Sequence, residues 1–469
     1  MNTSSEALQA HFQAQLRHYP EVGQGTAKAR IRKLRALRKA VSGPFKQPIR
    51  EALKADFGKP VLETDLTEIY PVCSEIRHAE KNLRDWMRPR RVRQPLTLIG
   101  ARSRVRYESK GVCLILAPWN FPLTLTLSPL VSAIAAGNCC ILKPSEFAPA
   151  TAAVIQEILE RLFPPEEVVV VQGDATVAEA LLKLPFHHIF FTGSPRVGKI
   201  VMKAAAEHLS SVTLELGGKS PAYVGRSASL KAAARRIAWG KCTNAGQICV
   251  APDYLLVDRE VEGALVAALK ENLDRFYPGG AIASESFSRI IHKKHYNRLA
   301  DALEEGLENG GEILYGGGGN PDACSMEPTL VRGLPEDSPL LREEIFGPIL
   351  PVIPVSGPEE ALQQIGKRER PLATYVFIRD QKEIRQILEG TRAGSTGINH
   401  NVVHYSNPHL PFGGVNNSGI GRSHGLEGFR AFSNARSELR QYTPSSIELL
   451  LPPYTRLKQR MADFTLRWL

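Results

Sequence analysis

Cys249 and Glu215 are the residues of this chain whose sequence settings best suit covalent chemistry. Cys249 ends the polar, Gly-containing sequence Asn-Ala-Gly-Gln-Ile-Cys, and Glu215 lies upstream in Thr-Leu-Glu-Leu-Gly-Gly-Lys. The thiolate is the reactive form of a cysteine nucleophile, and a carboxylate can act as the general base on a later water. Residues 187–207 show a strand–Gly–helix pattern typical of nucleotide binding, and a dinucleotide can accept electrons. Together these three segments predict covalent redox chemistry.

The Gly-rich turn at the centre of residues 187–207 reads Thr-Gly-Ser-Pro-Arg-Val-Gly-Lys and follows a run of buried-strand residues. Glycines let backbone amides approach a phosphate, and the N-terminus of the following helix adds a favourable dipole. The spacing up to Lys199 also fits a P-loop, but Ile200 stands where magnesium binding needs a hydroxyl. A purely structural turn is the other reading. The candidate phosphate contacts are Gly193, Ser194 and Gly198.

A rigid loop, Pro-Trp-Asn-Phe-Pro, surrounds Asn120 and follows a predicted strand. Two prolines and two aromatic residues can hold the Asn120 amide in a fixed place. A neutral amide donor suits an oxyanion that forms only during the reaction. Taken alone, the residue is equally well read as a turn asparagine.

Two more segments could contact a cofactor. Lys143 and Glu146 follow another predicted strand, at the sheet edge where open α/β sheets bind nucleotides. A glutamate there can accept from ribose hydroxyls, whereas a lysine can pair with them or with a 2′-phosphate. Residues 343–348 read Glu-Glu-Ile-Phe-Gly-Pro and include Glu344 and Phe346. Without further context that segment reads as a surface turn.

In combination and order, these motifs resemble the aldehyde dehydrogenase superfamily over residues 25–440, and its class 3 branch most closely. That branch handles aromatic and medium- to long-chain aliphatic aldehydes. The resemblance implies NAD or NADP as cofactor, a homodimer, and an aldehyde that is oxidised to an acid through a thiohemiacetal and a thioester on the cysteine. It implies as catalytic residues Cys249 (nucleophile), Glu215 (base) and Asn120 (oxyanion donor). It implies as cofactor contacts Trp119, Lys143, Glu146, Gly193, Ser194, Gly198, Leu216, Glu344 and Phe346.

The chain departs from the class 3 pattern near its C-terminus. It has Asn-His at residues 399–400 where the branch has Asn-Asp, and Asn416 where the branch has Gly. Both changes fall in the part that shapes the substrate entrance in this branch. Two other activities compete with aldehyde oxidation: an acyl-reducing enzyme of the same architecture and, more remotely, a P-loop nucleotide hydrolase. Glu215 speaks against the reductase, because an enzyme that must avoid water has no use for that base.

Short apolar runs alternate with helical patterns through much of the chain, which predicts a doubly wound parallel sheet. The expected fold is α/β, with a doubly wound parallel-sheet cofactor domain, an α/β catalytic domain and a small β oligomerisation arm. The expected division is an NAD(P)-binding domain at 1–85 and 106–215, a catalytic domain at 216–415, bridging or oligomerisation segments at 86–105 and 416–445, and an amphipathic tail at 446–469.

Composition narrows the function classes further. The formal net charge is +11, but the basic residues are scattered and no nucleic-acid-binding signature is present. Seven scattered cysteines in a chain of 469 residues favour reduced thiols. No metal-ligand spacing is found, so no metal is expected. The sequence has no signal-peptide layout, and we expect a cytoplasmic protein.

The C-terminal tail carries an apolar stripe at helical spacing, flanked by basic residues. Such a stripe usually packs against its own protein or a dimer partner. An interfacial helix that touches a membrane is the alternative, although the stripe is too short to span one. The stripe consists of Leu457, Met461, Phe464 and Trp468.

Overall fold

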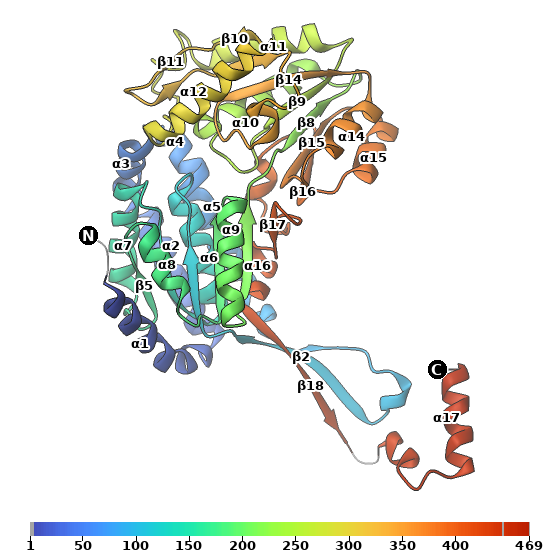
Figure 1. Cartoon of the computed structure of the whole chain (residues 1–469). Helices are drawn as coiled ribbons and strands as arrows, with labels where there is room; N and C mark the ends of the chain where they lie inside the picture. Colours follow the sequence, from blue (N-terminus) through green and yellow to red (C-terminus); the bar gives the residue numbers. More distant parts are fainter. Residues whose placement is uncertain (1–3, 443–444, 469) are drawn as a thin grey trace.

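The computed structural model describes residues 4–442 and 445–468 and shows two α/β lobes with a projecting arm (Figure 1). The first lobe is built on a six-stranded sheet with the strand order β17-β7-β6-β3-β4-β5. All its neighbours pair in parallel except β17 and β7, which are antiparallel. Its strands are β3 (Val112–Leu116), β4 (Cys139–Lys143), β5 (Val168–Val170), β6 (His188–Gly193), β7 (Ser211–Leu216) and β17 (Gly419–Ile420).

Helices cover both faces of this sheet because its strands are apolar on both sides. In β3, Cys113 and Ile115 belong to one core cluster, while Leu114 and Leu116 belong to another on the opposite face. The first face packs α2 (Ala27–Ser42), α3 (Lys46–Phe57), α5 (Tyr70–Trp86), α6 (Pro122–Ala136), α7 (Pro149–Leu162) and α16 (Gly425–Ala431). The second packs α1 (Ser5–Gly23), α8 (Ala175–Leu182) and α9 (Pro195–Glu207). A short helix α4 (Val61–Thr64) and a π-helical turn η1 (Asp65–Ile69) lead into α5.

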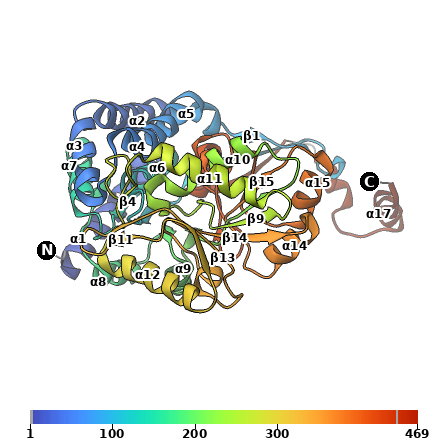
Figure 2. The ribbon, with the colours of Figure 1, turned by 90° about the horizontal axis from the view of Figure 1, so that it is seen from above.

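The second lobe holds a seven-stranded sheet with the order β10-β13-β14-β9-β8-β15-β16, parallel except for the β10–β13 pair. Seen from above, its helices lie around this sheet (Figure 2). Its strands are β8 (Pro221–Val224), β9 (Tyr254–Asp258), β10 (Glu312–Tyr315), β13 (Thr329–Arg332), β14 (Ile349–Val355), β15 (Ala373–Phe377) and β16 (Ser395–Ile398). Its helices are α10 (Leu230–Cys242), α11 (Glu262–Phe276), α12 (Lys293–Glu308), α13 (Pro339–Arg342), α14 (Pro358–Gly366) and α15 (Gln381–Gly390).

A three-stranded antiparallel sheet forms the arm, which extends away from both lobes (Figure 1). It consists of β1 (Arg90–Arg91), β2 (Ala101–Ser109) and β18 (Ser433–Gln441). Beyond it the chain makes a short 3₁₀ helix, η5 (Ser446–Leu450), and ends in α17 (Arg456–Trp468), which has no buried residue. The predicted fold class is thereby confirmed. Among the described residues, no helix is both long and apolar enough to cross a membrane.

Candidate active site

A cleft of about 230 Å³ between the two lobes gathers nine of the twelve site residues that the motifs predicted. The loops after β3, β6 and β7 reach it from the first sheet, and the turn that carries Cys249 reaches it from the second lobe. In an open α/β sheet this carboxyl edge of the strands is where ligands bind. The lining residues are Pro118, Trp119, Asn120, Leu125, Thr192, Gly193, Ser194, Glu215, Leu216, Gly217, Cys249, Arg298, Glu344 and Phe346.

A strained turn between α10 and β9 presents the Cys249 thiol to the cleft. Within the 3₁₀ turn η3 (Thr243–Gly246), Asn244 and Ala245 both have a φ of 50°, a left-handed conformation that is costly for residues with a Cβ. Gly246 follows with a φ of 75°, and a Cβ there would lie only 2.2 Å from the carbonyl oxygen of Gly347. The glycine before Cys249 is therefore required by close backbone approach.

Gln247 locks this turn against the loop that carries Asn120. The side-chain amide of Gln247 donates to the backbone carbonyls of Asn244 (2.9 Å) and Arg289 (3.0 Å). Its backbone carbonyl accepts from Asn120 Nδ2 (3.0 Å). The Asn120 amide has a second N–H, which this contact leaves available to an oxygen in the cleft. Asn120 and Cys249 are thus held by a shared set of hydrogen bonds.

The surroundings of Cys249 favour its neutral thiol over the thiolate. Burial raises the pKa of Cys249 well above its ordinary value, and the carboxylates of Glu344 and Glu215 raise it further. The backbone amides of Cys249 and Val250 act in the opposite direction, because they favour the thiolate. Burial and the two carboxylates thus disfavour the thiolate, and the two backbone amides partly offset them.

Glu215 is the penultimate residue of β7, and its nearly buried carboxyl lines the cleft. Burial raises the pKa of Glu215 to about 7, although hydrogen bonds from Ser423 and Thr192 partly offset that rise. The Ser423 hydroxyl makes a short contact with one carboxyl oxygen, and Thr192 Oγ1 lies 3.4 Å from the other. A carboxyl with a pKa near 7 suits a general base at neutral pH.

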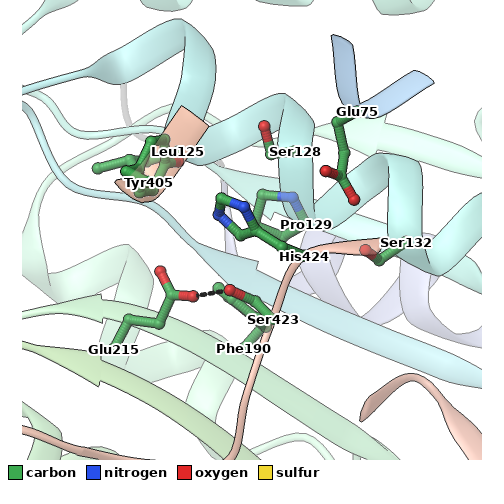
Figure 3. A pocket seen from close by; sticks show the side chains of 10 residues that line it. All are labelled: Glu75, Leu125, Ser128, Pro129, Ser132, Phe190, Glu215, Tyr405, Ser423 and His424. Carbon is green, nitrogen blue, oxygen red and sulfur yellow. Dashed lines mark hydrogen bonds between the residues drawn. The ribbon is translucent and has the colours of Figure 1, made fainter. Parts of the chain in front are cut away.

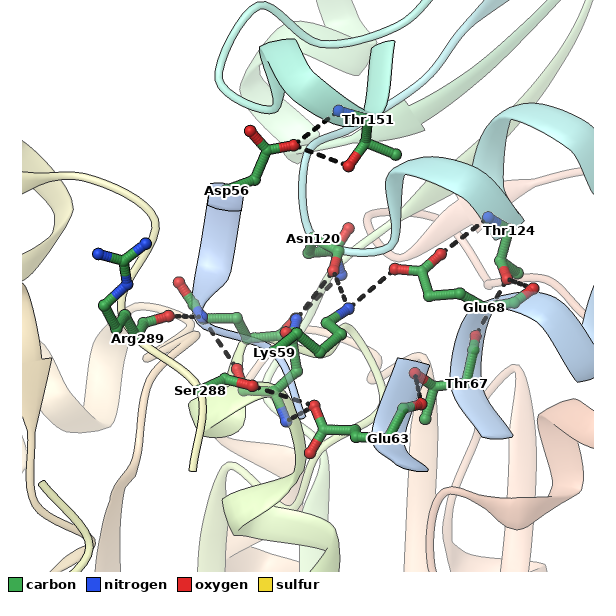
Figure 4. A network of polar contacts seen from close by, with 12 residues as sticks. Asp56, Lys59, Glu63, Thr67, Glu68, Asn120, Thr124, Thr151, Ser288 and Arg289 are labelled. Atoms are coloured by element: carbon green, nitrogen blue, oxygen red, sulfur yellow. Dashed lines mark hydrogen bonds and ion pairs between the residues drawn. The ribbon is translucent and has the colours of Figure 1, made fainter. Parts of the chain in front are cut away.

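A buried ionic network supports the Asn120 loop from behind (Figure 4). Lys59 Nζ contacts Glu68 Oε1 at 2.8 Å and the carbonyl oxygen of Asn120 at 3.4 Å. The second carboxyl oxygen of Glu68 accepts from the backbone amide of Thr124, at 2.9 Å. The side chains of Lys59 and Glu68 are both fully buried. Sequence reasoning missed this pair, and no motif marks it.

The Gly-rich turn lies where β6 meets α9. Ser194 is the N-cap of α9, and its hydroxyl accepts from the Val197 amide at 3.4 Å. Gly198 lies one turn into the helix, where a Cβ would approach Leu216 to 2.8 Å, so this glycine allows close helix–strand packing. Because α9 already begins at Pro195, the segment does not form the open phosphate loop that a P-loop hydrolase needs.

The opposite wall of the cleft carries Glu344 and Phe346. Burial raises the pKa of Glu344 to about 8, and the charge of Asp253 adds to this effect. Glu344 Oε1 is buried without a hydrogen-bond partner among the described residues, and a Cβ on Gly217 would lie 2.0 Å from Oε2. Phe346 has a φ of 53°, and its ring meets that of Trp119 edge-on at 5.3 Å. An unpaired carboxyl oxygen beside aromatic rings fits a ribose hydroxyl next to a flat heterocycle.

Three predicted cofactor contacts lie outside the cleft lining. Lys143 and Glu146 form an ion pair with each other at 3.0 Å, at the carboxyl end of β4, and Gly198 is buried within α9, against Leu216 of β7. Arg298 is a lining residue that sequence reasoning missed, since α12 carries no recognisable motif. It donates to the backbone carbonyl of Ile345, which helps to hold the loop of Phe346.

No cluster of three or more His, Cys, Asp or Glu suited to a metal is found in residues 4–442 or 445–468.

Comparisons with known proteins agree with this architecture. The model of the aldehyde dehydrogenase family matches residues 1–437. The 4,4′-diaponeurosporen-aldehyde dehydrogenase of Staphylococcus aureus is 41% identical over 91% of this chain and 92% of its own length. Aldehyde dehydrogenase family 3 member B1 of Rattus norvegicus is 42% identical over 89% of this chain and 88% of its own length. A solved structure described as the substrate-bound state of Staphylococcus aureus AldH is 38% identical and has a TM-score of 0.94, covering 99% of this chain and 100% of that one.

These relatives confirm the resemblance to class 3 enzymes, NAD or NADP as cofactor, and the oxidation of an aldehyde to an acid. They also exclude the nucleotide hydrolase. With the family model covering almost the whole chain, this protein belongs to the aldehyde dehydrogenase family.

Proposed function

We propose that Cys249 is the nucleophile, Glu215 the base and Asn120 the oxyanion donor of this aldehyde dehydrogenase. The observation that carries this assignment is that one cleft holds all three side chains, although they come from three separate segments of the chain. Cys249 is the only one of the seven cysteines that lines this cleft. The Asn120 amide also keeps a free N–H for an oxyanion, and burial gives Glu215 a pKa of about 7.

In this mechanism the Cys249 thiol gives its proton to a water molecule in the cleft, and the resulting thiolate sulfur bonds to the aldehyde carbon while the carbonyl π bond breaks to leave an oxyanion. The free N–H of Asn120 and the backbone amide of Cys249 then stabilise the oxyanion. When bound, NAD or NADP would accept the hydride from the carbon attached to Cys249, and that carbon, its carbonyl restored, would remain as a thioester on the sulfur. Glu215 takes a proton from water, whose oxygen attacks the thioester carbon, and the carbon–sulfur bond breaks to release the acid and the thiolate.

We further propose that Trp119, Gly193, Ser194, Leu216, Glu344 and Phe346 bind the cofactor, with Gly198 holding α9 close. Lys143 and Glu146 would contact its ribose once their mutual ion pair opens. The first lobe would then be the cofactor domain and the second the catalytic domain. The proposed substrates are aromatic or medium- to long-chain aldehydes, and the proposed compartment is the cytoplasm. The similarity to class 3 enzymes supports the proposed substrates.

The arm and tail support the proposal of a homodimer. Helix α17 leaves Leu457 (67%), Phe464 (63%) and Trp468 (66%) exposed, and no part of the two lobes covers them. A second copy of this chain would bury that face, as an apolar helix face usually requires. Membrane contact is the alternative. Truncation after Pro453 should break the dimer in the first case, and in the second it should abolish co-sedimentation with anionic liposomes.

The catalytic assignment is tested by replacing Cys249 with Ala and, as a matched control, Cys324 with Ala. Both thiols are free and partly exposed, but only Cys249 lines the cleft. Reduction of NAD and NADP would be followed with benzaldehyde and medium-chain aliphatic aldehydes. We expect Cys249→Ala to lose activity while cofactor binding survives, and Cys324→Ala to keep activity. Substantial turnover by Cys249→Ala would refute the assignment.

A further inference from the structure

A carboxyl group of the first lobe reaches across to the turn that carries Cys249. Glu63, on α4, accepts through Oε1 from the hydroxyl of Ser288 at 3.2 Å (Figure 4). The same oxygen accepts from the backbone amide of Asn244 at 3.0 Å. Both donors belong to the second lobe, whereas α4 belongs to the first. Ser288 is 1% exposed and Glu63 is half-buried, so this contact joins the two lobes in a largely enclosed place.

The chain before Glu63 is docked onto the second lobe at two further points. The backbone amide of Arg289 donates to the carbonyl oxygen of Phe57 at 2.7 Å, and its guanidinium donates to that of Ala55 at 2.9 Å. The carbonyl oxygen of Arg289 accepts in turn from the side chain of Gln247. These bonds fix the start of α4 relative to the second lobe, so Glu63 reaches the turn from a fixed position.

Asn244 connects Glu63 to the two groups that are to react. Its φ of 50° is a strained, left-handed conformation, so the turn needs outside contacts to keep this shape. Its side-chain amide donates to the carbonyl oxygen of Asn120 at 2.9 Å and to that of Gln247 at 3.2 Å. Gln247 lies two residues before Cys249. A shift of Asn244 would therefore disturb the fit between the turn of Cys249 and the loop of Asn120.

Hydrogen bonds, and not an ion pair, define the surroundings of the Glu63 carboxyl group. Burial raises the pKa of Glu63, and the positive charge of Lys59 acts in the opposite direction. Lys59 itself forms its ion pair with Glu68, whose carboxyl group raises the pKa of Glu63 further. A neutral group of the same shape should therefore be tolerated at position 63, provided that it offers an acceptor oxygen.

The position of the turn matters because the Cys249 sulfur and the oxyanion donor must meet one carbonyl group. The sulfur attacks its carbon while an N–H of Asn120 binds its oxygen, and a misplacement of about 1 Å can cost about 100-fold in rate. On this basis, which rests on the proposed function, we propose that Glu63 is a positioning residue that holds the Cys249 turn in register with the Asn120 loop. Glu63 touches no substrate and acts only through Asn244.

Two reactions of Cys249 distinguish positioning from a general loss of structure. Acetylation by p-nitrophenyl acetate, without cofactor, needs the sulfur and the oxyanion donor aligned on one carbonyl group. Alkylation by iodoacetamide needs only the sulfur, because iodide leaves from a saturated carbon and no oxyanion forms. Both reactions would be followed in the full-length protein by mass spectrometry of the peptide that contains Cys249.

Three variants of Glu63 carry the test. Glu63→Ala removes the acceptor of the Asn244 amide, and Glu63→Asp keeps a carboxyl group near Lys59 but is one carbon shorter. We expect both to slow acetylation by about 10- to 100-fold while alkylation is unchanged. Glu63→Gln keeps an acceptor oxygen and should acetylate at the unmodified rate. The matched control is Glu51→Ala on α3, which loses only a contact with Gln47 of the same helix and should also react normally.

The pH dependence of thioester hydrolysis separates positioning from proton transfer. Glu215 sets this dependence in the proposed mechanism, and the Ser423 hydroxyl contacts its carboxyl group (Figure 3). Because Glu63 moves no proton, the pH at which hydrolysis is half-maximal should be the same in Glu63→Asp as in the unmodified protein. A shifted pH would assign Glu63 to proton transfer and overturn the positioning role.

The proposal is overturned if Glu63→Ala and Glu63→Asp acetylate as fast as the unmodified protein. It is also overturned if alkylation slows as much as acetylation, because the turn would then have lost its structure as a whole. A Glu63→Gln variant as slow as Glu63→Ala would assign the effect to charge and overturn it too. Should Glu63→Ala fail to fold, Glu63→Asp carries the same test. An unmodified protein that takes no acetyl group at Cys249 would instead overturn the proposed function, and the role of Glu63 with it.

Discussion

Replacing Ser423 with Ala should shift the pH dependence of thioester hydrolysis upward. The Ser423 hydroxyl contacts one carboxyl oxygen of Glu215 and stabilises the ionised form, which lowers a pKa that burial would otherwise raise further. A hydrogen bond to a charged group contributes about 1.5–3 kcal/mol, which corresponds to roughly 1–2 pKa units. Without it, the pKa of Glu215 should move from about 7 to roughly 8–9.

The shift has a measurable consequence at neutral pH. At pH 7 about half of Glu215 is ionised in the unmodified protein, and in Ser423→Ala only ~1–10% should be, so hydrolysis should slow by roughly 5- to 50-fold. In the assay, Cys249 is acetylated with p-nitrophenyl acetate without cofactor, and loss of the acetyl group is followed across the pH range. The readout is the pH at which the rate of this loss is half-maximal. Thr192→Val is a graded control, because its 3.4 Å contact should give a smaller shift. A midpoint that stays in place or falls would refute this account of Glu215.

Three further changes probe the supports of the site. Lys59→Met leaves Glu68 buried without its cation and should lower the free energy of unfolding, measured with urea, by about 3–5 kcal/mol. A decrease below ~1 kcal/mol would contradict a structural role for the Lys59–Glu68 pair. Gly217→Ala places a Cβ 2.0 Å from Glu344 Oε2 and should displace that carboxyl group. Calorimetry should therefore show weaker NAD binding, while thioester hydrolysis without cofactor is unchanged. Unaltered NAD binding would count against Glu344 as a cofactor contact. Folded Glu75 keeps its proton to about pH 7, against 4.5 ordinarily, so the unmodified protein should lose up to about 3 kcal/mol of stability as pH rises through that window. Glu75→Gln should lack this loss. If the difference in melting temperature between Glu75→Gln and the unmodified protein does not vary with pH, Glu75 does not cause the loss.

The sequence predicted elements and residues that local pattern determines. The alternation of apolar strands and helices predicted the α/β fold with its parallel sheets, which the two lobes show. The motif residues Asn120, Glu215 and Cys249 were found because each lies in a distinctive local sequence. Their meeting in one cleft depends on the tertiary fold, and only the resemblance anticipated it.

What the sequence did not reveal are contacts between distant segments. Ser423 touches Glu215 across 208 positions, and Gly425 donates to Glu75 across 350. No local pattern distinguishes these residues from ordinary loop and helix positions. The pKa values of Glu215 and Glu75 were unpredictable for the same reason, because burial in the folded lobe sets them.

The most direct test of the account is to trap the thioester in Glu215→Gln. This variant, mixed with NAD and benzaldehyde and then quenched in acid, would be analysed by intact-protein and peptide mass spectrometry. The account predicts a rapid burst of reduced cofactor followed by slow turnover, with a benzoyl group on the peptide that contains Cys249. Turnover at the unmodified rate, or reduced cofactor formed without any acyl group on Cys249, would contradict it.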